Sequence, residues 1–415
     1  MGSNSKIPKV RFTGRHRADT ALRREKHITE EAMKKNYLRK SLFLAVLSVT
    51  FFLSGCGGKG EKNNQAGIDA YQKKDYATAI KSYSAAIAQD NRKASYYINL
   101  AMAYVETGEY ENALTQIGFA LELEPKNQSA YRSKGIIYIA LNDYENAILA
   151  LEQALHLADG FVGNMEYDIL DYRAIAESKS GNYQKAIETY TVLLNVGYKP
   201  AEHYYLRGSS YLLSGDLDKA KADFTHAIEN QKSSYDLYLN IYQALSEYGA
   251  EEDGVFYLEE ALKLDLGKKE DNFSKGKIYF FLGDYTSAIS YLLKESSNPE
   301  ANLYLGKIYM ATGDTAQAFI TFQQYLESSP DNGDVYNQLG MMRFEAGAYQ
   351  EALTYFQSGL GCGDLSARKS LAFNEAVTYE YLLDFDTALE KFRTYISSYP
   401  DDAQALKEYE FLKSR

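Results

Sequence analysis

Four stretches of the sequence share one pattern: DYATAIKSY (residues 75–83), EYENALTQI (109–117), DYENAILAL (143–151) and NYQKAIETY (182–190). Each has alanine at its fifth position, and a small residue recurs in the same way along the rest of the chain. The ten positions are Ala79, Ala113, Ala147, Ala186, Ala220, Gly254, Ala288, Ala318, Ala352 and Ala388. The spacings between them are 34, 34, 39, 34, 34, 34, 30, 34 and 36 residues, so six of nine are equal. A fixed period of this length is typical of repeated supersecondary units.

Two further positions follow the same period. Nine of the ten residues that stand twelve positions earlier are Gly or Ala, the exception being Tyr242: Gly67, Ala101, Gly135, Ala174, Gly208, Tyr242, Gly276, Gly306, Gly340 and Ala376. The residues four positions later are all large and apolar: Tyr83, Ile117, Leu151, Tyr190, Phe224, Leu258, Leu292, Phe322, Phe356 and Phe392. Small residues let two helices approach closely, and a large residue one turn further on fills the adjacent groove. The pattern therefore predicts helix pairs that stack into one continuous core.

Ten repeats in register resemble the tetratricopeptide repeat family over about residues 60–400. The tryptophan usual early in this repeat is absent, and tyrosine replaces it at Tyr97, Tyr131, Tyr204, Tyr238 and Tyr336. The resemblance implies an all-α fold, a right-handed superhelical solenoid of about ten helix-turn-helix repeats over residues 67–400. Residues 401–415 are expected to form a capping helix over the last repeat.

The turns inside the repeats carry their own signals. Glycine is expected to end the first helix of a pair, as at Gly108 and Gly313. Aspartate recurs at the start of the second helix, where a carboxylate can accept hydrogen bonds from free amides. A row of aspartates could be mistaken for an acid–base site, but we interpret them as helix caps: Asp75, Asp143, Asp216, Asp284, Asp314 and Asp384.

Irregular spacings predict three joints in the solenoid. The spacing of 39 adds residues around 158–166, the spacing of 30 removes residues near 295–299, and the spacing of 36 adds residues within 361–368. We expect altered stacking angles there, and thus blocks of three, four and three repeats.

The residues before the repeats resemble a bacterial lipoprotein signal. Residues 33–40 carry four positive charges and no negative one, and residues 41–53 carry no charge. This order is typical of a signal peptide. A stretch of thirteen uncharged residues is shorter than the about 20 apolar residues that a membrane-spanning helix needs. Leu53-Ser54-Gly55-Cys56 resembles a lipobox, which implies cleavage of residues 33–55 and acylation of Cys56. An ordinary signal peptide and an uncleaved anchor are the alternatives.

The flanking segments complete this interpretation. Residues 56–66 are expected to be a lipidated cysteine and a flexible tether that runs into the first repeat, because Gly and polar residues cannot form a core. Residues 1–32 precede the basic region, which should itself begin a signal peptide. They are interpreted as a non-native extension or as a disordered tail.

Composition argues against several functions. The chain has a net charge of −11, and residues 1–55 hold 12 basic and 4 acidic residues, so the part from Cys56 onward carries 33 basic and 52 acidic residues. A surface with this excess of acidic residues repels the phosphate backbone of nucleic acids. With Cys56 acylated, Cys362 is the only remaining thiol and no intramolecular disulfide can form. The five histidines are scattered, and no zinc, redox or phosphate-binding motif occurs, so we expect no enzyme, cofactor or metal.

A binding surface is expected on the first helices, because the resemblance implies that peptides or partner domains bind along the concave side that they form. Exposed aromatic patches often mark such sites. The candidate residues are Asn99, Tyr205, Asn240, Phe273, Lys277, Phe280, Phe281, Met341, Phe344, Phe373 and Asn374. Phe280 and Phe281 are adjacent and are not expected both to face inward. The alternative is that these aromatic residues pack against the first helix of the next repeat.

These features together predict a non-enzymatic scaffold outside the bacterial cell membrane. A lipid at Cys56 would hold it on the extracytoplasmic face, in the outer membrane if the host has one. Its partner would be a protein or peptide of the cell envelope. The alternative is a surface receptor that binds extended peptides or glycans in the groove.

Overall fold

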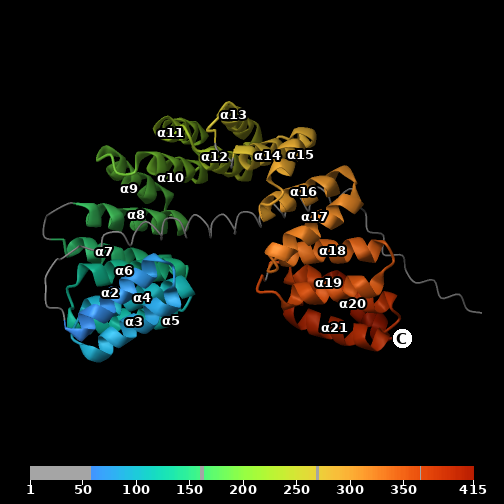
Figure 1. Ribbon diagram of the computed structural model, residues 1–415, viewed down its shortest axis with the longest axis horizontal. Helices are drawn as coiled ribbons and strands as arrows, with labels where there is room; N and C mark the ends of the chain where they lie inside the picture. The colour runs from blue at the N-terminus through green and yellow to red at the C-terminus, as the bar shows by residue number, and fades with distance from the viewer. Residues whose placement is uncertain (1–57, 159–162, 268–270, 365) are drawn as a thin grey trace, which may run out of the picture. The chain divides into compact units, whose positions relative to one another are not determined.

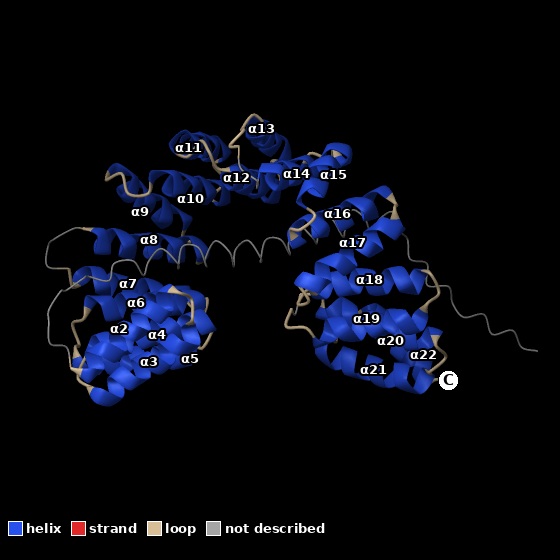
Figure 2. Cartoon of the chain, viewed as in Figure 1, coloured by secondary structure: helices blue, strands red, loops and turns tan. Residues whose placement is uncertain are grey.

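The structure is a computed structural model that describes residues 58–158, 163–267, 271–364 and 366–415. Within these ranges every regular element is a helix, and turns or short loops join the helices (Figures 1 and 2). The predicted all-α fold is confirmed. Among the described helices, none is long and apolar enough to cross a membrane.

Twenty of the helices form ten consecutive pairs (Figure 1). The first helices are α2 (Lys59–Gln72), α4 (Ala94–Thr107), α6 (Gln128–Ala140), α8 (Asn164–Lys179), α10 (Pro200–Leu213), α12 (Tyr235–Tyr248), α14 (Asp271–Phe281), α16 (Pro299–Thr312), α18 (Gly333–Glu345) and α20 (Arg368–Tyr381). The second helices are α3 (Tyr76–Gln89), α5 (Tyr110–Leu123), α7 (Tyr144–His156), α9 (Tyr183–Asn195), α11 (Leu217–Asn230), α13 (Glu251–Leu262), α15 (Tyr285–Leu292), α17 (Thr315–Ser328), α19 (Tyr349–Gly361) and α21 (Phe385–Ser398). A short 3-10 helix, η1 (Leu293–Glu295), extends α15, and α22 (Ala403–Lys413) is the predicted capping helix.

The predicted contact between small and large residues holds each pair together. A Cβ atom built on Gly340 would lie 2.3 Å from Cε1 of Phe356, so that ring rests directly on the glycine backbone. Gly67 with Tyr83 and Gly306 with Phe322 show the same contact at 2.5 and 2.4 Å. The large residues of all ten pairs are buried, and in nine of the pairs a glycine or alanine beneath leaves room for them.

The sixth pair exchanges the two sizes. Tyr242 occupies the position that is small elsewhere, and Gly254 occupies the position of the recurring alanine. A Cβ atom on Gly254 would lie 3.0 Å from Cδ2 of Tyr242, so the glycine makes the space that the tyrosine needs. The helix crossing is therefore kept close although the small residue lies on the other helix.

The turn signals act as predicted. Gly108 and Gly313 end α4 and α16 with φ of 79° and 83°, a conformation that favours glycine. Each of the six recurring aspartates accepts a hydrogen bond from the backbone N–H three residues later and caps a second helix; they are Asp75, Asp143, Asp216, Asp284, Asp314 and Asp384.

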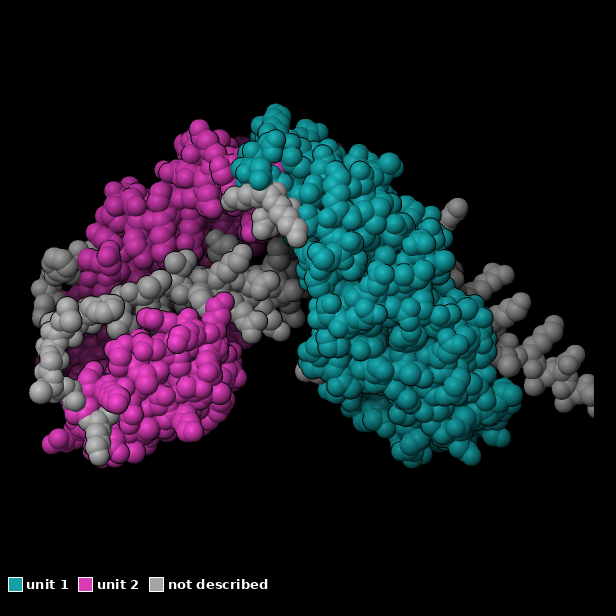
Figure 3. Space-filling model, in the orientation of Figure 1, with its two compact units in different colours: residues 1–35, 255–415 teal, residues 36–254 magenta. Residues whose placement is uncertain are grey.

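The chain separates into two compact units (Figure 3). In the text the first unit is the one that ends at Gly254, which Figure 3 labels unit 2 (magenta), and the second unit is the one that begins at Val255, which Figure 3 labels unit 1 (teal). The boundary lies inside α13, and none of the three predicted joints coincides with it. Those joints fall in connections: α7 to α8, α15 through η1 to α16, and α19 to α20. Changed stacking angles at these connections stay a prediction.

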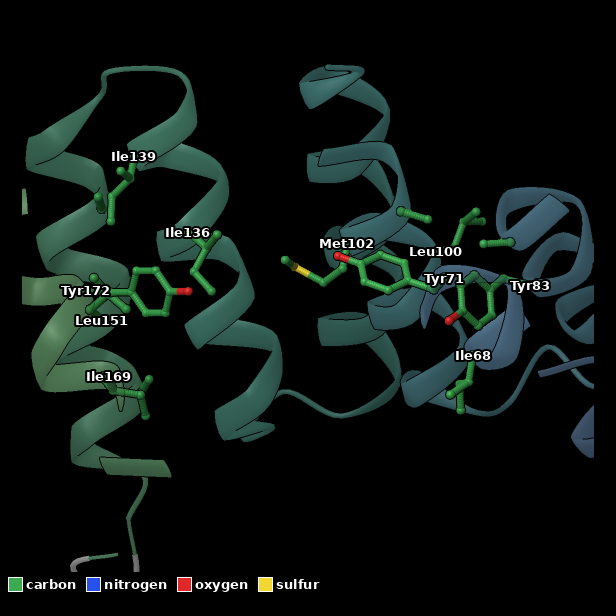
Figure 4. Packing of buried hydrophobic residues seen from close by; sticks show 14 of the residues in the cluster. Ile68, Tyr71, Tyr83, Leu100, Met102, Ile136, Ile139, Leu151, Ile169 and Tyr172 are labelled. Carbon is green, nitrogen blue, oxygen red and sulfur yellow. The ribbon is translucent and has the colours of Figure 1, made fainter. Parts of the chain in front are cut away.

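The first unit contains an apolar core that runs through several repeats. Figure 4 shows part of it, with Ile68 and Tyr71 of α2 beside Leu100 of α4, and Ile136 of α6 close to Tyr172 of α8. These residues come from successive first helices, and Leu151 of α7 joins them. Each repeat thus buries its apolar face against its neighbours in the sequence.

The first helix begins earlier than predicted. The extension 1–32, the signal peptide 33–55 and Cys56 lie outside the described residues, but α2 starts at Lys59. Residues 59–66 are therefore helical, and the predicted flexible tether 56–66 is wrong for most of its length. The reason is tertiary: a Cβ atom on Gly60 would lie 3.3 Å from the carbonyl oxygen of Ala86, so the start of α2 packs on the end of α3.

The capping helix closes the second unit. Ala405 and Leu412 are buried against the last pair, together with Tyr395 of α21. Asp402 caps α22 and also accepts a 2.8 Å hydrogen bond from the Tyr395 hydroxyl. Near the C-terminal end of α20, Oε1 of Glu380 is buried without a hydrogen-bond partner among the described residues. Burial and the charge of Glu408 on α22 raise the pKa of Glu380 to about 7.

Glu380→Gln is expected to stabilise the chain at pH 8 by about 1 kcal/mol after allowance for solvent screening, and to have little effect at pH 4. A carboxyl with a raised folded pKa favours the folded state at low pH, and this contribution is lost as the pH rises from about 4.5 to 7. Urea unfolding at both pH values measures the difference. Glu390→Gln, at an exposed site on α21, is the control. Equal pH profiles for Glu380→Gln and the unmodified chain would contradict the assignment.

Candidate partner-binding surface

The second unit brings the aromatic residues of α14 together with α16. The Phe280 ring lies 5.2 Å from the Tyr304 ring and 5.3 Å from the Phe281 ring, edge to face in both cases. Nζ of Lys277 lies 5.4 Å from the Phe273 ring centre and 5.6 Å from that of Tyr304. The four predicted residues are half-buried, while Tyr304 is buried.

This geometry corrects the expectation about Phe280 and Phe281. Both rings pack against the same cluster, because Tyr304 from the next repeat fills the space between the two first helices. Tyr304 was missed in the sequence because its role depends on a neighbour one repeat away. Its burial raises the pKa of its hydroxyl to about 12, so it stays a neutral hydrogen-bond donor. Both rings thus pack between repeats, which is the alternative raised by the sequence. A partner could contact only the parts of the two rings that stay exposed.

The candidates on α18 and α20 are packed to different degrees. Phe344 is 8% exposed and lies 4.8 Å from the Tyr381 ring, which argues against its prediction as a surface residue. The Phe373 ring is half-buried and lies 5.7 Å from the Phe392 ring. Met341 is half-buried in the same core. The Asn374 amide donates a 2.8 Å hydrogen bond to the side chain of Asn337 on α18.

In the first unit the three candidates lie on different first helices. The Asn99 amide on α4 donates a 2.9 Å hydrogen bond to the side chain of Asn64 on α2, as Asn374 does to its neighbour. Tyr205 on α10 is half-buried beside Phe224, and burial raises its pKa to about 12. Asn240 on α12 is half-buried.

The structure reveals a polar cluster that the sequence did not single out. His203 of α10 is fully buried, and its Nε2 lies 3.1 Å from Oδ1 of Asp171 on α8. Nδ1 lies 2.6 Å from the carbonyl oxygen of Tyr198. Both neighbouring oxygen atoms are hydrogen-bond acceptors. The Nε2 contact is not aligned as a hydrogen bond, so the ring and the carboxylate lie in close contact without one.

Two cations complete this cluster. Nζ of Lys199 donates to Oδ2 of Asp171 at 3.0 Å, and Arg132 of α6 pairs with Asp168 of α8. Burial opposes ionisation of Asp171, but the ring of His203 and the charge of Lys199 outweigh it and lower its pKa. The signal in the sequence is that Arg132, Asp171 and His203 stand at repeat positions that are mostly apolar in the other repeats.

The described residues offer little for catalysis. They contain no group of His, Cys, Asp and Glu side chains that could hold a metal ion. Cys362 is half-buried, its thiol lies 2.9 Å from the Gly359 carbonyl oxygen, and burial raises its pKa. A thiol with a raised pKa is a weak nucleophile.

Profiles of the tetratricopeptide repeat match six segments that together span more than half of the chain: residues 64–117, 98–160, 201–234, 273–333, 321–367 and 371–402. The chain belongs to the tetratricopeptide repeat family. Tetratricopeptide repeat proteins are generally non-enzymatic scaffolds, and the repeats of this protein indicate a scaffold for protein–protein interaction.

Individual relatives are distant. The protein is 23% identical to BBSome complex member BBS4 of Bos taurus over 46% of this chain and 37% of the relative. It is 42% identical to the Hsp70-Hsp90 organizing protein of Triticum aestivum over 12% of this chain and 9% of the relative. The chain thus spans less than half the length of the curated relatives it matches.

Two solved tetratricopeptide repeat structures resemble this chain. A tetratricopeptide repeat protein from Parabacteroides merdae has a TM-score of 0.46 and 16% identity, and covers 69% of this chain and 99% of that one. The YrrB protein, described as having an unusual peptide-binding site, has a TM-score of 0.36 and 22% identity, with 48% and 99% covered. At this similarity neither carries an argument about the ligand of this protein.

Proposed function

We propose that this tetratricopeptide repeat protein is a lipid-anchored scaffold on the extracytoplasmic face of a bacterial membrane. The observation that carries the proposal is the order of a basic segment, an apolar segment and Leu53-Ser54-Gly55-Cys56 directly before the first repeat. A single acyl chain anchors a protein only marginally, whereas two hold it stably, which suits a diacylated cysteine.

Cys56→Ala is expected to abolish lipid attachment and processing. The unmodified protein should enter the detergent phase of a phase-partition assay, incorporate labelled palmitate and begin at Cys56. The variant should lose the label and keep residues before position 56. Cys362→Ser is the matched control, because it removes the other cysteine and should leave the lipid in place. A native protein that retains residues 33–55 and takes up no label would contradict the proposal.

The scaffold is proposed to bind a protein or peptide partner of the cell envelope through the first helices. Support comes from the half-buried cluster on α14 and α16, where Lys277 lies against two aromatic rings and the ring edges of Phe280 and Phe281 remain partly exposed. Clustered aromatic residues and a basic residue supply most of the energy at many interfaces. The same cluster would suit the alternative receptor for extended peptides or glycans.

Phe280→Ala is expected to weaken capture of the partner by at least about 30-fold, the equivalent of about 2 kcal/mol. Partner capture from detergent-solubilised host membranes and the melting temperature are measured together. Ile320→Ala on α17 removes an exposed apolar side chain of a second helix and should change neither. If Phe280→Ala lowers the melting temperature while the folded protein still captures its partner normally, the ring serves only packing between repeats. Capture of a short peptide or glycan instead of a folded protein would favour the receptor.

A further inference from the structure

The start of α2 lies very close in the chain to the proposed lipid. Lys59 is the first residue of α2 and follows Cys56 by three positions. An extended chain spans at most about 3.5 Å per residue, so Cys56 lies within about 10 Å of the helix start. The connection is too short for the first repeat to move far from an acylated cysteine.

The start of α2 is also fixed to the rest of the first repeats. A Cβ atom on Gly60 would touch the end of α3, and the Tyr96 hydroxyl on α4 donates a 2.9 Å hydrogen bond to Glu61. One turn later the amide of Asn99 donates to Asn64, which is 6% exposed. Unwinding α2 to lengthen the connection would break these contacts.

The loop between α3 and α4 lies at the same end of the first repeat as the start of α2. The start of α2 contacts both the end of α3, which precedes this loop, and the start of α4, which follows it. Arg92 and Lys93 are exposed in this loop, and Lys62 is exposed on α2. Two carboxylates lie at the same end: Asp90 pairs with Arg92, and Glu61 keeps its charge while it accepts a hydrogen bond from Tyr96. Three positive and two negative side chains leave this end with a net charge of +1, so it is a weakly positive edge on a chain whose net charge is −11.

We infer that the first repeat stands end-on against the membrane, with the start of α2 and the loop of residues 90–93 facing anionic lipid headgroups. The inference rests on the proposed lipid at Cys56. A positive edge is attracted to anionic headgroups, whereas the acidic sides of the solenoid would be repelled if the repeats lay flat. The membrane thus fixes the direction in which the first repeat points.

Two single-cysteine probes test the orientation in the lipidated full-length protein with Cys362→Ser. Asn91→Cys places a fluorophore in the exposed loop at the membrane end without removing a charge, and Lys73→Cys places one at the other end of α2, about 20 Å further along this 14-residue helix. The protein is reconstituted in vesicles of phosphatidylcholine and phosphatidylglycerol that contain a nitroxide-labelled headgroup lipid. Quenching at position 91 should exceed that at position 73 several-fold. A Gly-Ser spacer of about fifteen residues inserted after Gly58 should remove the difference, since such a linker reaches about 20 Å.

The outcomes separate the two proposals. Equal quenching at both positions in vesicle-bound protein overturns the end-on orientation and leaves the lipid anchor intact. Stronger quenching at position 73, or a difference that survives the spacer, also overturns it. Protein that carries no lipid and does not bind the vesicles overturns the anchor and, with it, the orientation.

Discussion

Asp171→Asn is expected to destabilise the first unit by about 3–5 kcal/mol, because it removes a buried carboxylate that pairs with Lys199 and contacts the fully buried ring of His203. Asp171 is 4% exposed and lies 3.0 Å from Nζ of Lys199 and 3.1 Å from Nε2 of His203. Asparagine keeps the volume but not the charge. The variant therefore leaves the half-buried Lys199 beside a neutral group, and turns an amide toward a fully buried ring.

The pH dependence has a defined sign. The lowered pKa of Asp171 contributes stability above its ordinary value near 4 and loses it as the pH falls further. The pKa of Lys199 is raised because the attraction of Asp171 and Glu202 outweighs burial, so its contribution is present below about 10.5 and is lost at higher pH. The deficit of Asp171→Asn should be largest between these limits and should shrink in acid.

Urea unfolding and amide hydrogen exchange of the full chain measure the effect. Glu229→Gln on α11 is the control, since its ion pair with His226 is exposed and is worth at most about 1 kcal/mol. Loss of protection should centre on α8 and α10. A stability loss for Asp171→Asn no larger than that for Glu229→Gln would show that the polar cluster does not hold these repeats together.

Phe356→Ala should cost about 3–5 kcal/mol in the second unit. The ring is fully buried directly over the backbone of Gly340, and alanine leaves a cavity between α18 and α19. Repeats of a solenoid contact only their neighbours, so exchange should rise in α18 to α21 and stay unchanged in residues 58–254.

Gly340→Ala tests the same contact from the other side. A Cβ atom 2.3 Å from Phe356 must push the ring away, at about 1–3 kcal/mol. Phe356→Leu should recover part of that loss when combined with Gly340→Ala, because leucine is smaller than phenylalanine and the second pair packs the aliphatic Ile117 with Ala101. Additive losses in the double variant would contradict contact between the two residues. Loss of exchange protection along the whole chain would contradict the description in which each repeat contacts only its neighbours.

The sequence alone determined the helix pairs, their small and large contact positions, the aspartate caps and the capping helix. These features are encoded within one repeat or its immediate neighbour. Because they recur in ten repeats, they can be recognised even in the sixth pair, where Tyr242 and Gly254 exchange the large and the small position. Only the tertiary structure decided the start of α2, the burial of Phe344, the joint packing of Phe280 and Phe281 on Tyr304, and the ion contacts of Asp171. Each of these four features depends on side chains that come from a different helix. The repeat period shows which positions recur, but it does not show which face of a helix the neighbouring helices will bury.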